Sequence, residues 1–138
     1  MVLCDFVQVA EGKLFINGGG WNHKGLTTPM GVGLLVEVPW SETNIGHNVR
    51  LILEDADGHP VEAPGPLGPQ PLVIEAQIEV GRPPGMPHGS SINVPMAINV
   101  PPPPLLPDTS YRWRFEVEGK SQDDWHVAFR TKSAGPEA

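Results

Sequence analysis

The sequence predicts an all-β fold: a two-sheet antiparallel β-sandwich of seven to nine strands, immunoglobulin-like or jelly-roll-like. Runs at 72–80, 91–100 and 111–119 alternate apolar and polar residues with a period of two, which is typical of strands with one face in a core. The 17 prolines and 16 glycines fall mainly between such runs, where they indicate turns and loops. No run of ten or more residues has helical periodicity, so each strand must bury its face against another sheet. A closed barrel is the alternative.

The N-terminal half begins with a predicted β-hairpin. Its two runs are joined by a turn that contains Gly12. A flexible connection at 18–29 and a loop at 39–47 separate the next strands. The pair Asp57-Gly58 is the strongest hairpin signal in the chain. The strands predicted in this half lie at 2–9, 14–17, 30–38 and 48–55.

The C-terminal half combines the three alternating runs with three proline-rich connections. We expect the segments 64–71 and 81–90 to be surface loops, and 101–110 to be a stiff strap across one end of the sandwich. Pro95 interrupts the run 91–100, which implies an edge strand or a bulge there. A final hairpin is predicted from Tyr111 to Arg130.

The alternation also predicts which side chains are buried. Arg112, Arg114 and Glu116 should face solvent. The predicted core consists of Leu34, Val36, Leu51, Leu53, Ile74, Ile78, Val94, Ile98, Trp113 and Phe115.

Length and charge restrict the organisation and the partners. A chain of 138 residues fits one domain, predicted at 1–132 and followed by a frayed tail at 133–138. The formal net charge of −7 argues against nucleic acid and against an anionic membrane surface as partners. The N-terminus lacks the features of a signal peptide, and a lone cysteine, Cys4, forms no intrachain disulfide. Together these features favour a cytoplasmic location.

Several loop sequences carry a resemblance to a known family. They are GGGW (18–21), PWSETN (39–44), LEDADGHPV (53–61) and GRPPGMPHGS (81–90) followed by VPMAINVP (94–101). Together they resemble a family of small bacterial proteins described only as a domain of unknown function. The resemblance covers nearly the whole chain and implies a compact β-sandwich. It implies no activity, substrate or cofactor.

Catalytic and metal-binding motifs are absent from the sequence. The five histidines include no HxH or HExxH spacing. There is no GxSxG motif, and Glu75 and Glu79 lie on one outward strand face. We therefore expect no catalytic residue, no metal site and no cofactor.

The candidate binding site is a group of loop residues. Trp21 follows three glycines, Trp40 shares a short loop with Glu42 and Asn44, and Arg82 opens the RPPG loop. A tryptophan flanked by turn residues can be a binding platform, or its indole can plug the end of the sandwich. Arg82 and Glu42 can equally form a structural pair.

Three functions remain open at this stage. The first is a non-catalytic binding or assembly module whose partner is a protein, including another copy of itself as a homodimer. The second is a small-ligand module, for a sugar for example, that uses Trp21 or Trp40. The third is a metal-assisted enzyme that uses some of the scattered histidines.

Overall fold

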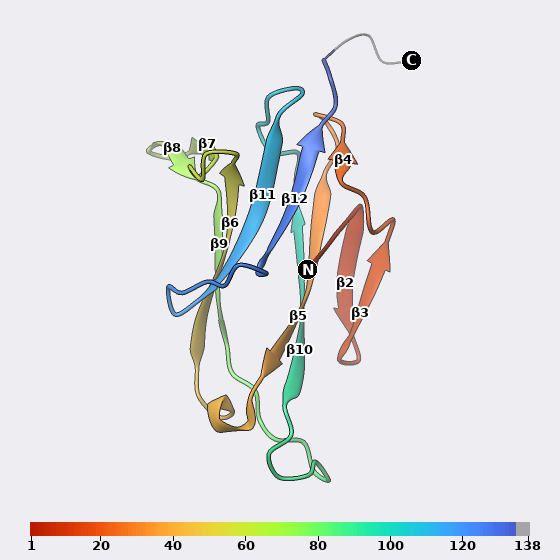
Figure 1. The fold of residues 1–138 in the computed structure, drawn as a ribbon, viewed down its shortest axis with the longest axis vertical. Coiled ribbons are helices and arrows are strands. Elements are labelled where there is room, and N and C mark those ends of the chain that lie inside the picture. Colours follow the sequence, from red (N-terminus) through yellow and green to blue (C-terminus); the bar gives the residue numbers. More distant parts are fainter. Residues whose placement is uncertain (135–138) are drawn as a thin grey trace.

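A computed structural model describes residues 1–134 and places two β-sheets face to face (Figure 1). Residues 135–138 of the predicted tail lie outside the described part. The first half of that part contains β1 (Val2–Cys4), β2 (Phe6–Ala10), β3 (Lys13–Asn17), β4 (His23–Lys24), β5 (Met30–Val38), the short 3-10 helix η1 (Trp40–Glu42) and β6 (His47–Asp55). The second half contains β7 (Glu62–Gly65), β8 (Gly68–Pro71), β9 (Val73–Ile78), β10 (Ile92–Val100), β11 (Ser110–Val117) and β12 (His126–Thr131).

The two main sheets have three and five strands. The smaller has the order β1-β5-β10, and the larger has the order β4-β12-β11-β6-β9. Every pair in them is antiparallel except β12 and β4, which are parallel. The hairpins β2–β3 and β7–β8 form two small separate sheets. The predicted all-β sandwich is therefore confirmed, although residues 1–134 contain more strands than the seven to nine expected.

The core fills the space between the two main sheets. Leu34, Leu51, Leu53, Trp113 and Phe115 are buried as the alternation predicts. The other five predicted core residues are only half-buried: Val36, Ile74, Ile78, Val94 and Ile98. These five residues lie on β5, β9 and β10. They are less buried because β9 and β10 are edge strands and part of β5 has a free edge.

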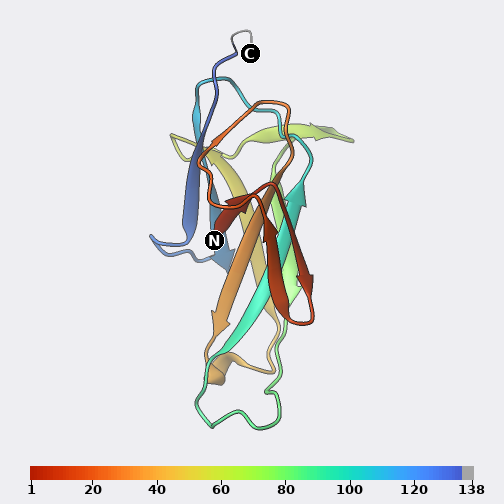
Figure 2. The ribbon, with the colours of Figure 1, turned by 90° about the vertical axis from the view of Figure 1, so that its right-hand side faces the viewer.

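The hairpin β2–β3 packs against the outer face of the small sheet (Figure 2). Val7 is fully buried there, and Asn99 of β10 holds it through two hydrogen bonds, one from the Val7 N–H and one to the Val7 carbonyl. A Cβ on Gly31 would lie 3.0 Å from both Asn99 Oδ1 and Cys4 Sγ. The glycine at this outward position therefore permits the close approach of the hairpin.

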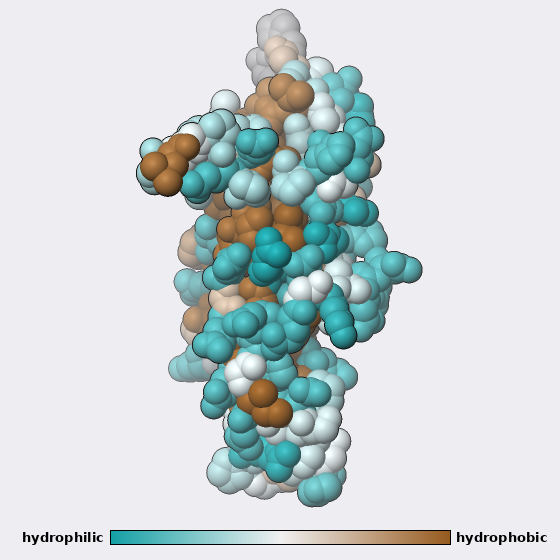
Figure 3. Space-filling model, turned by 90° about the vertical axis from the view of Figure 1, so that its left-hand side faces the viewer, coloured by the Kyte–Doolittle hydropathy of each residue, from teal (hydrophilic) through white to brown (hydrophobic). Residues whose placement is uncertain are grey.

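The predicted surface loop at 64–71 is wrong, because most of it forms the hairpin β7–β8. Pro64 lies directly opposite Pro69. Proline is tolerated in a two-stranded edge hairpin, where each strand needs backbone donors on one side only. The hairpin projects from the body of the molecule (Figure 3). Leu67, at its turn, is 94% exposed.

The prediction that Glu116 faces solvent freely is also wrong. Glu116 points outward from β11 yet is 8% exposed, and Glu54 beside it on β6 is 3% exposed. Arg114 donates to both carboxylates, and Arg112 donates to Glu54. The long arginine side chains cover the carboxylates they pair with, so Arg112 and Arg114 are themselves only half-exposed.

The predictions for Pro95 and for the prolines at 101–104 agree with the topology. β10, which contains Pro95, is an edge strand of the small sheet. The segment after it crosses from the small sheet to β11 in the large one. The Tyr111 hydroxyl accepts the Leu106 N–H at 2.9 Å and so fixes the end of this connection. No helix within residues 1–134 is long and apolar enough to cross a membrane.

Candidate binding cleft

Four of the five predicted site residues lie around η1, at the lower end of Figure 1. Arg82 donates to Thr43 Oγ1 at 2.7 Å and to the Trp40 carbonyl at 2.9 Å. Its guanidinium carbon lies 4.0 Å from the centre of the Trp40 ring, and the His88 ring lies 4.9 Å from that ring. Arg82 thus ties the 81–90 loop to η1, rather than forming an ion pair with Glu42.

Glu42 and Asn44 also have structural contacts. Asn44 adopts a positive φ of 61° and donates its N–H to the Val80 carbonyl at 2.7 Å. The Glu42 carbonyl contacts His47 Nε2 at 2.9 Å. Both residues therefore shape the loop, and both remain exposed.

Trp21 lies away from this group, next to β4 near the upper end of Figure 1. Its indole N–H donates to Asp5 Oδ1 at 3.1 Å, and its ring meets Phe129 edge-on at 6.2 Å. Trp21 is partly buried against the core. The structure therefore does not bring the two candidate tryptophans together.

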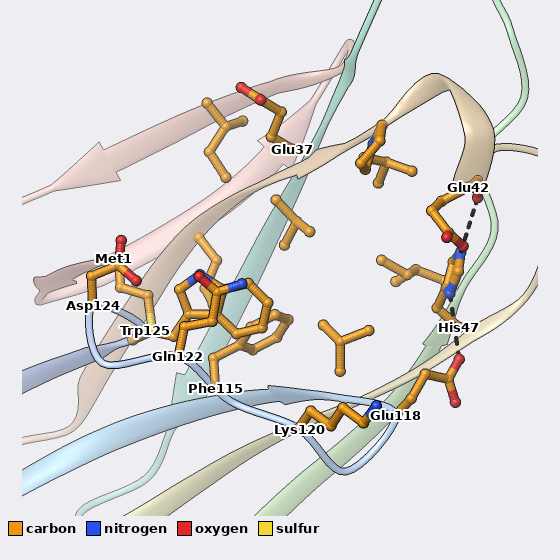
Figure 4. A pocket seen from close by; sticks show the side chains of 17 residues that line it. Met1, Glu37, Glu42, His47, Phe115, Glu118, Lys120, Gln122, Asp124 and Trp125 are labelled. Atoms are coloured by element: carbon orange, nitrogen blue, oxygen red, sulfur yellow. Dashed lines mark hydrogen bonds and ion pairs between the residues drawn. The ribbon is translucent and has the colours of Figure 1, made fainter.

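A cleft of about 670 Å³ opens between the two sheets beside β5 (Figure 4). One wall is the stretch Leu34–Val38, and the other is formed by β11 and the loop that follows it. The apolar side chains that line it are Met1, Leu34, Leu35, Val36, Val38, Pro39, Ile78, Phe115, Val117 and Trp125. Glu37, Glu42, His47, Glu118, Lys120, Gln122 and Asp124 are its polar lining residues.

The cleft lies where strand pairing is incomplete on both sheets. Within residues 1–134, β1 pairs only with Gly31–Gly33 of β5, so Leu34–Val38 have a strand neighbour, β10, on one side alone. On the other sheet, β12 starts at His126, which pairs with Arg114. Beyond that point the loop at 118–125 contacts β11 through single hydrogen bonds, such as that from the Phe115 N–H to the Trp125 carbonyl.

Two residues of β5, Leu35 and Glu37, direct their backbone N–H and C=O groups to this free edge. The Leu3 carbonyl accepts the Gly20 N–H and so points away from β5. Because backbone groups alternate sides along a strand, Val2 and Cys4 point toward their β5 partners, Gly33 and Gly31. The same alternation along β5 turns the N–H and C=O groups of Leu35 and Glu37 to the side that has no strand.

Carboxylates surround the opening. In Figure 4, Glu37 lies above the cleft, Asp124 at one end, and Glu42 and Glu118 at the other. His47 lies between the last two, with Nε2 3.7 Å from Glu42 and Nδ1 3.4 Å from Glu118. The hydrogen bond with the Glu42 backbone, aided by the carboxylates, raises the pKa of His47 above its ordinary value.

The described residues contain one group of side chains placed closely enough to hold a metal ion, at the turn after β6. Ligand atoms of Asp55, Asp57 and His59 lie within 4.8 Å of one another. However, Asp55 Oδ1 accepts the backbone N–H groups of Asp57 and His59 at 2.9 and 3.0 Å. Since these bonds close the turn that Asp57-Gly58 predicts, the cluster has a structural explanation.

Residues 1–129 match the model of a family of unknown function, DUF6941. The chain belongs to this family. No curated protein and no solved structure matches the chain. Membership in DUF6941 agrees with the resemblance noted in the loops and assigns no role to any residue.

The sequence predictions missed most of the cleft of this family member. Its apolar walls come from Leu34, Val36 and Phe115, which the alternation predicts as core, together with Val38 and Trp125. Alternation shows which face of a strand is inward but not whether another strand covers its edge. The register of β1 on β5, with Val2 opposite Gly33, carries that information, and no motif in the sequence indicates it.

Proposed function

We propose that the domain is a non-catalytic protein-binding module, and that the cleft beside Leu34–Val38 is its binding site. The observation that carries the proposal is the unpaired main chain of Leu35 and Glu37 next to an apolar cleft. Free strand edges are common points of attachment for another chain, because the backbone groups there need partners. The half-exposed Trp125 adds an aromatic anchor of the kind enriched in protein interfaces.

We also infer that the sandwich is immunoglobulin-like. The sheet orders β1-β5-β10 and β4-β12-β11-β6-β9, with β4 parallel to β12, support this. The Tyr111 hydroxyl bonded to a backbone group five residues upstream is a further feature that immunoglobulin-type sandwiches share. A location in the cytoplasm is part of the same proposal and is supported by the single, fully buried Cys4.

A small apolar ligand is the rival occupant. The cleft volume of about 670 Å³ lies within the range of about 300–1,000 Å³ typical of ligand sites. Trp40, one of the two tryptophans expected to stack on a small ligand such as a sugar, instead contacts Arg82 and His88. The protein proposal therefore explains the free backbone groups, whereas a small apolar ligand leaves them unpaired.

Site-specific photo-crosslinking tests the proposal. A photoreactive residue replaces Gln122 at the cleft, or Lys13 at the tip of the β2–β3 hairpin as the control, in cells that naturally make the chain; both positions are exposed. We expect a discrete protein adduct from position 122 that a Val36→Glu substitution removes, and none from position 13. Equal adducts from both positions, or none from position 122, would reject the cleft as a protein site.

A further inference from the structure

Resting on this proposed function, we infer that the partner segment is a basic, extended peptide that adds to the free edge of β5 as a further β-strand. Its apolar residues alternate with lysine or arginine. The inference concerns the chemical class of the partner, and it follows from three features of the cleft: the edge, the lining and the charge.

The edge determines the conformation of the partner. Leu35 and Glu37 each present an N–H and a C=O to the side that β1 leaves uncovered. An extended strand is the backbone form that satisfies two such residues at alternate positions. The uncovered stretch Leu34–Val38 has five residues, which corresponds to about 17 Å of strand. A segment of about five to seven residues therefore fills it.

The lining determines one face of the partner. Leu34, Val36 and Val38 face the interior of the sandwich, and the cleft behind them is bounded by Phe115 and Trp125. Because side chains alternate across a strand, every second residue of an added strand points into this apolar space. Those positions take apolar side chains.

The charge determines the remaining positions. Glu37 lies on the outer side of β5, and Glu42, Glu118 and Asp124 flank the cleft, against one lysine, Lys120, and His47. The chain as a whole carries a formal charge of −7. A second copy would set these acids against each other at the joined edges, which is unfavourable. A partner strand with lysine or arginine on its outward positions is complementary.

Three synthetic peptides of eight residues test the inference on the full-length chain. Valine occupies alternate positions, and the others are lysine, serine or glutamate. Any tag is placed at the C-terminus, because Met1 lines the cleft. Two-dimensional NMR follows the amide signals of Leu35 and Glu37, and titration gives the dissociation constants in 50 and 300 mM salt.

We expect the lysine peptide to bind at least about tenfold more tightly than the serine peptide in 50 mM salt, and to lose most of that advantage in 300 mM salt. The shifted amides should include Leu35 and Glu37. A lysine peptide N-methylated at its lysine residues keeps its charge but lacks the backbone donors that an antiparallel strand directs at Leu35 and Glu37. It should not bind, because strand pairing requires those donors.

Paired substitutions give a second measurement on the protein. The double substitution Glu37→Gln with Asp124→Asn should lower the affinity for the lysine peptide by about fivefold or more. Glu11→Gln with Glu62→Gln, two exposed glutamates outside the cleft lining, should change its affinity by less than twofold.

The outcomes separate this inference from the proposed function. If the serine or glutamate peptide binds at Leu35 and Glu37 as tightly as the lysine peptide or more tightly, the inference that the partner is basic is overturned. The proposal that the cleft binds a protein is then retained. Undiminished binding of the N-methylated peptide overturns strand addition. If no peptide shifts these amides, the inference is overturned, and the crosslinking result still decides the function.

Discussion

The two halves of β5 belong to one continuous strand, yet they have different surroundings. Gly31 and Gly33 in the first half pair with β1, and the β2–β3 hairpin covers their outer face. In the part of the chain that the structure describes, no strand lies beside Leu35 and Glu37 of the second half on that side, and Leu35 is 58% exposed. Both halves keep the same pairing with β10 throughout.

The difference shows that one strand can serve stability and binding in separate segments. In the first half, glycines at outward positions allow other backbone to pack closely. In the second half, outward positions carry larger side chains and the main chain stays available. The inward residues are alike in both halves, so the division depends on the outward residues and on the register of β1.

The largest effect on stability is expected from adding a side chain in the half of β5 that β1 and the β2–β3 hairpin cover. Gly31→Val places side-chain atoms against Asn99, Cys4 and Val7, which lie 3.0–3.2 Å from a Cβ at this position. Overpacking of this kind typically costs about 1–3 kcal/mol, and we expect that loss in the free energy of unfolding by urea denaturation. Glu37→Val, in the open half, is the matched control and should change it by less than about 0.5 kcal/mol. Equal losses in both variants would contradict the comparison.

Removing the contact that holds the hairpin should have the next largest effect. Asn99→Ala deletes both hydrogen bonds to Val7 and should destabilise the fold by about 1–2 kcal/mol, at roughly 1 kcal/mol a bond. Asn93 faces outward on the same strand opposite Glu37 and provides the control, because the hairpin does not reach it. If Asn93→Ala lowers the melting temperature by a similar amount, the contact of Asn99 with the hairpin does not account for the loss in Asn99→Ala.

Amide hydrogen exchange compares the two halves of β5 without any substitution. The amides of Gly31 and Gly33 face β1, whereas those of Leu35 and Glu37 face the open side. We expect the latter pair to exchange about tenfold faster or more, because unpaired amides need no local opening. Comparable protection of all four amides would mean that the open half has a partner in the isolated chain.

The smallest effect concerns the ion pairs at the end of the open half. The pKa of His47 is raised in the fold, so its protonated form is stabilising below its ordinary pKa of about 6.5, and that contribution fades as the pH rises through the raised value. We expect His47→Gln to lower the melting temperature more at pH 6 than at pH 8.5. The difference should correspond to less than about 1 kcal/mol and should shrink in 0.5 M salt. If His47→Gln lowers the melting temperature more at pH 8.5 than at pH 6, the protonated form of His47 does not stabilise the fold.

The fold was largely predictable because alternation acts locally. The strands at 48–55 and 111–117 bury Leu51, Leu53, Trp113 and Phe115 as expected. The turns predicted at Gly12 and Gly58 are present, and both glycines have a positive φ. The hairpin β7–β8 was not predictable, since its prolines normally indicate a loop. Glu54 and Glu116 were missed because their burial depends on arginines from neighbouring strands.

The site was less predictable than the fold. The loop around Trp40, Glu42, Asn44 and Arg82 was expected to be a binding site or to contain a structural pair of Arg82 and Glu42. Its contacts are mostly to its own backbone and hydroxyl groups. Trp21 lies elsewhere, against Phe129. The cleft depends on where strand pairing is incomplete on each sheet, and that is a property of the three-dimensional structure.

The open edge of β5 also affects the solubility of the isolated chain. An exposed strand edge is a template for aggregation unless charges keep identical molecules apart. Here the rim carboxylates and the overall acidity, a formal net charge of −7, provide that repulsion. The same residues that select a basic partner therefore maintain colloidal stability when the partner is absent.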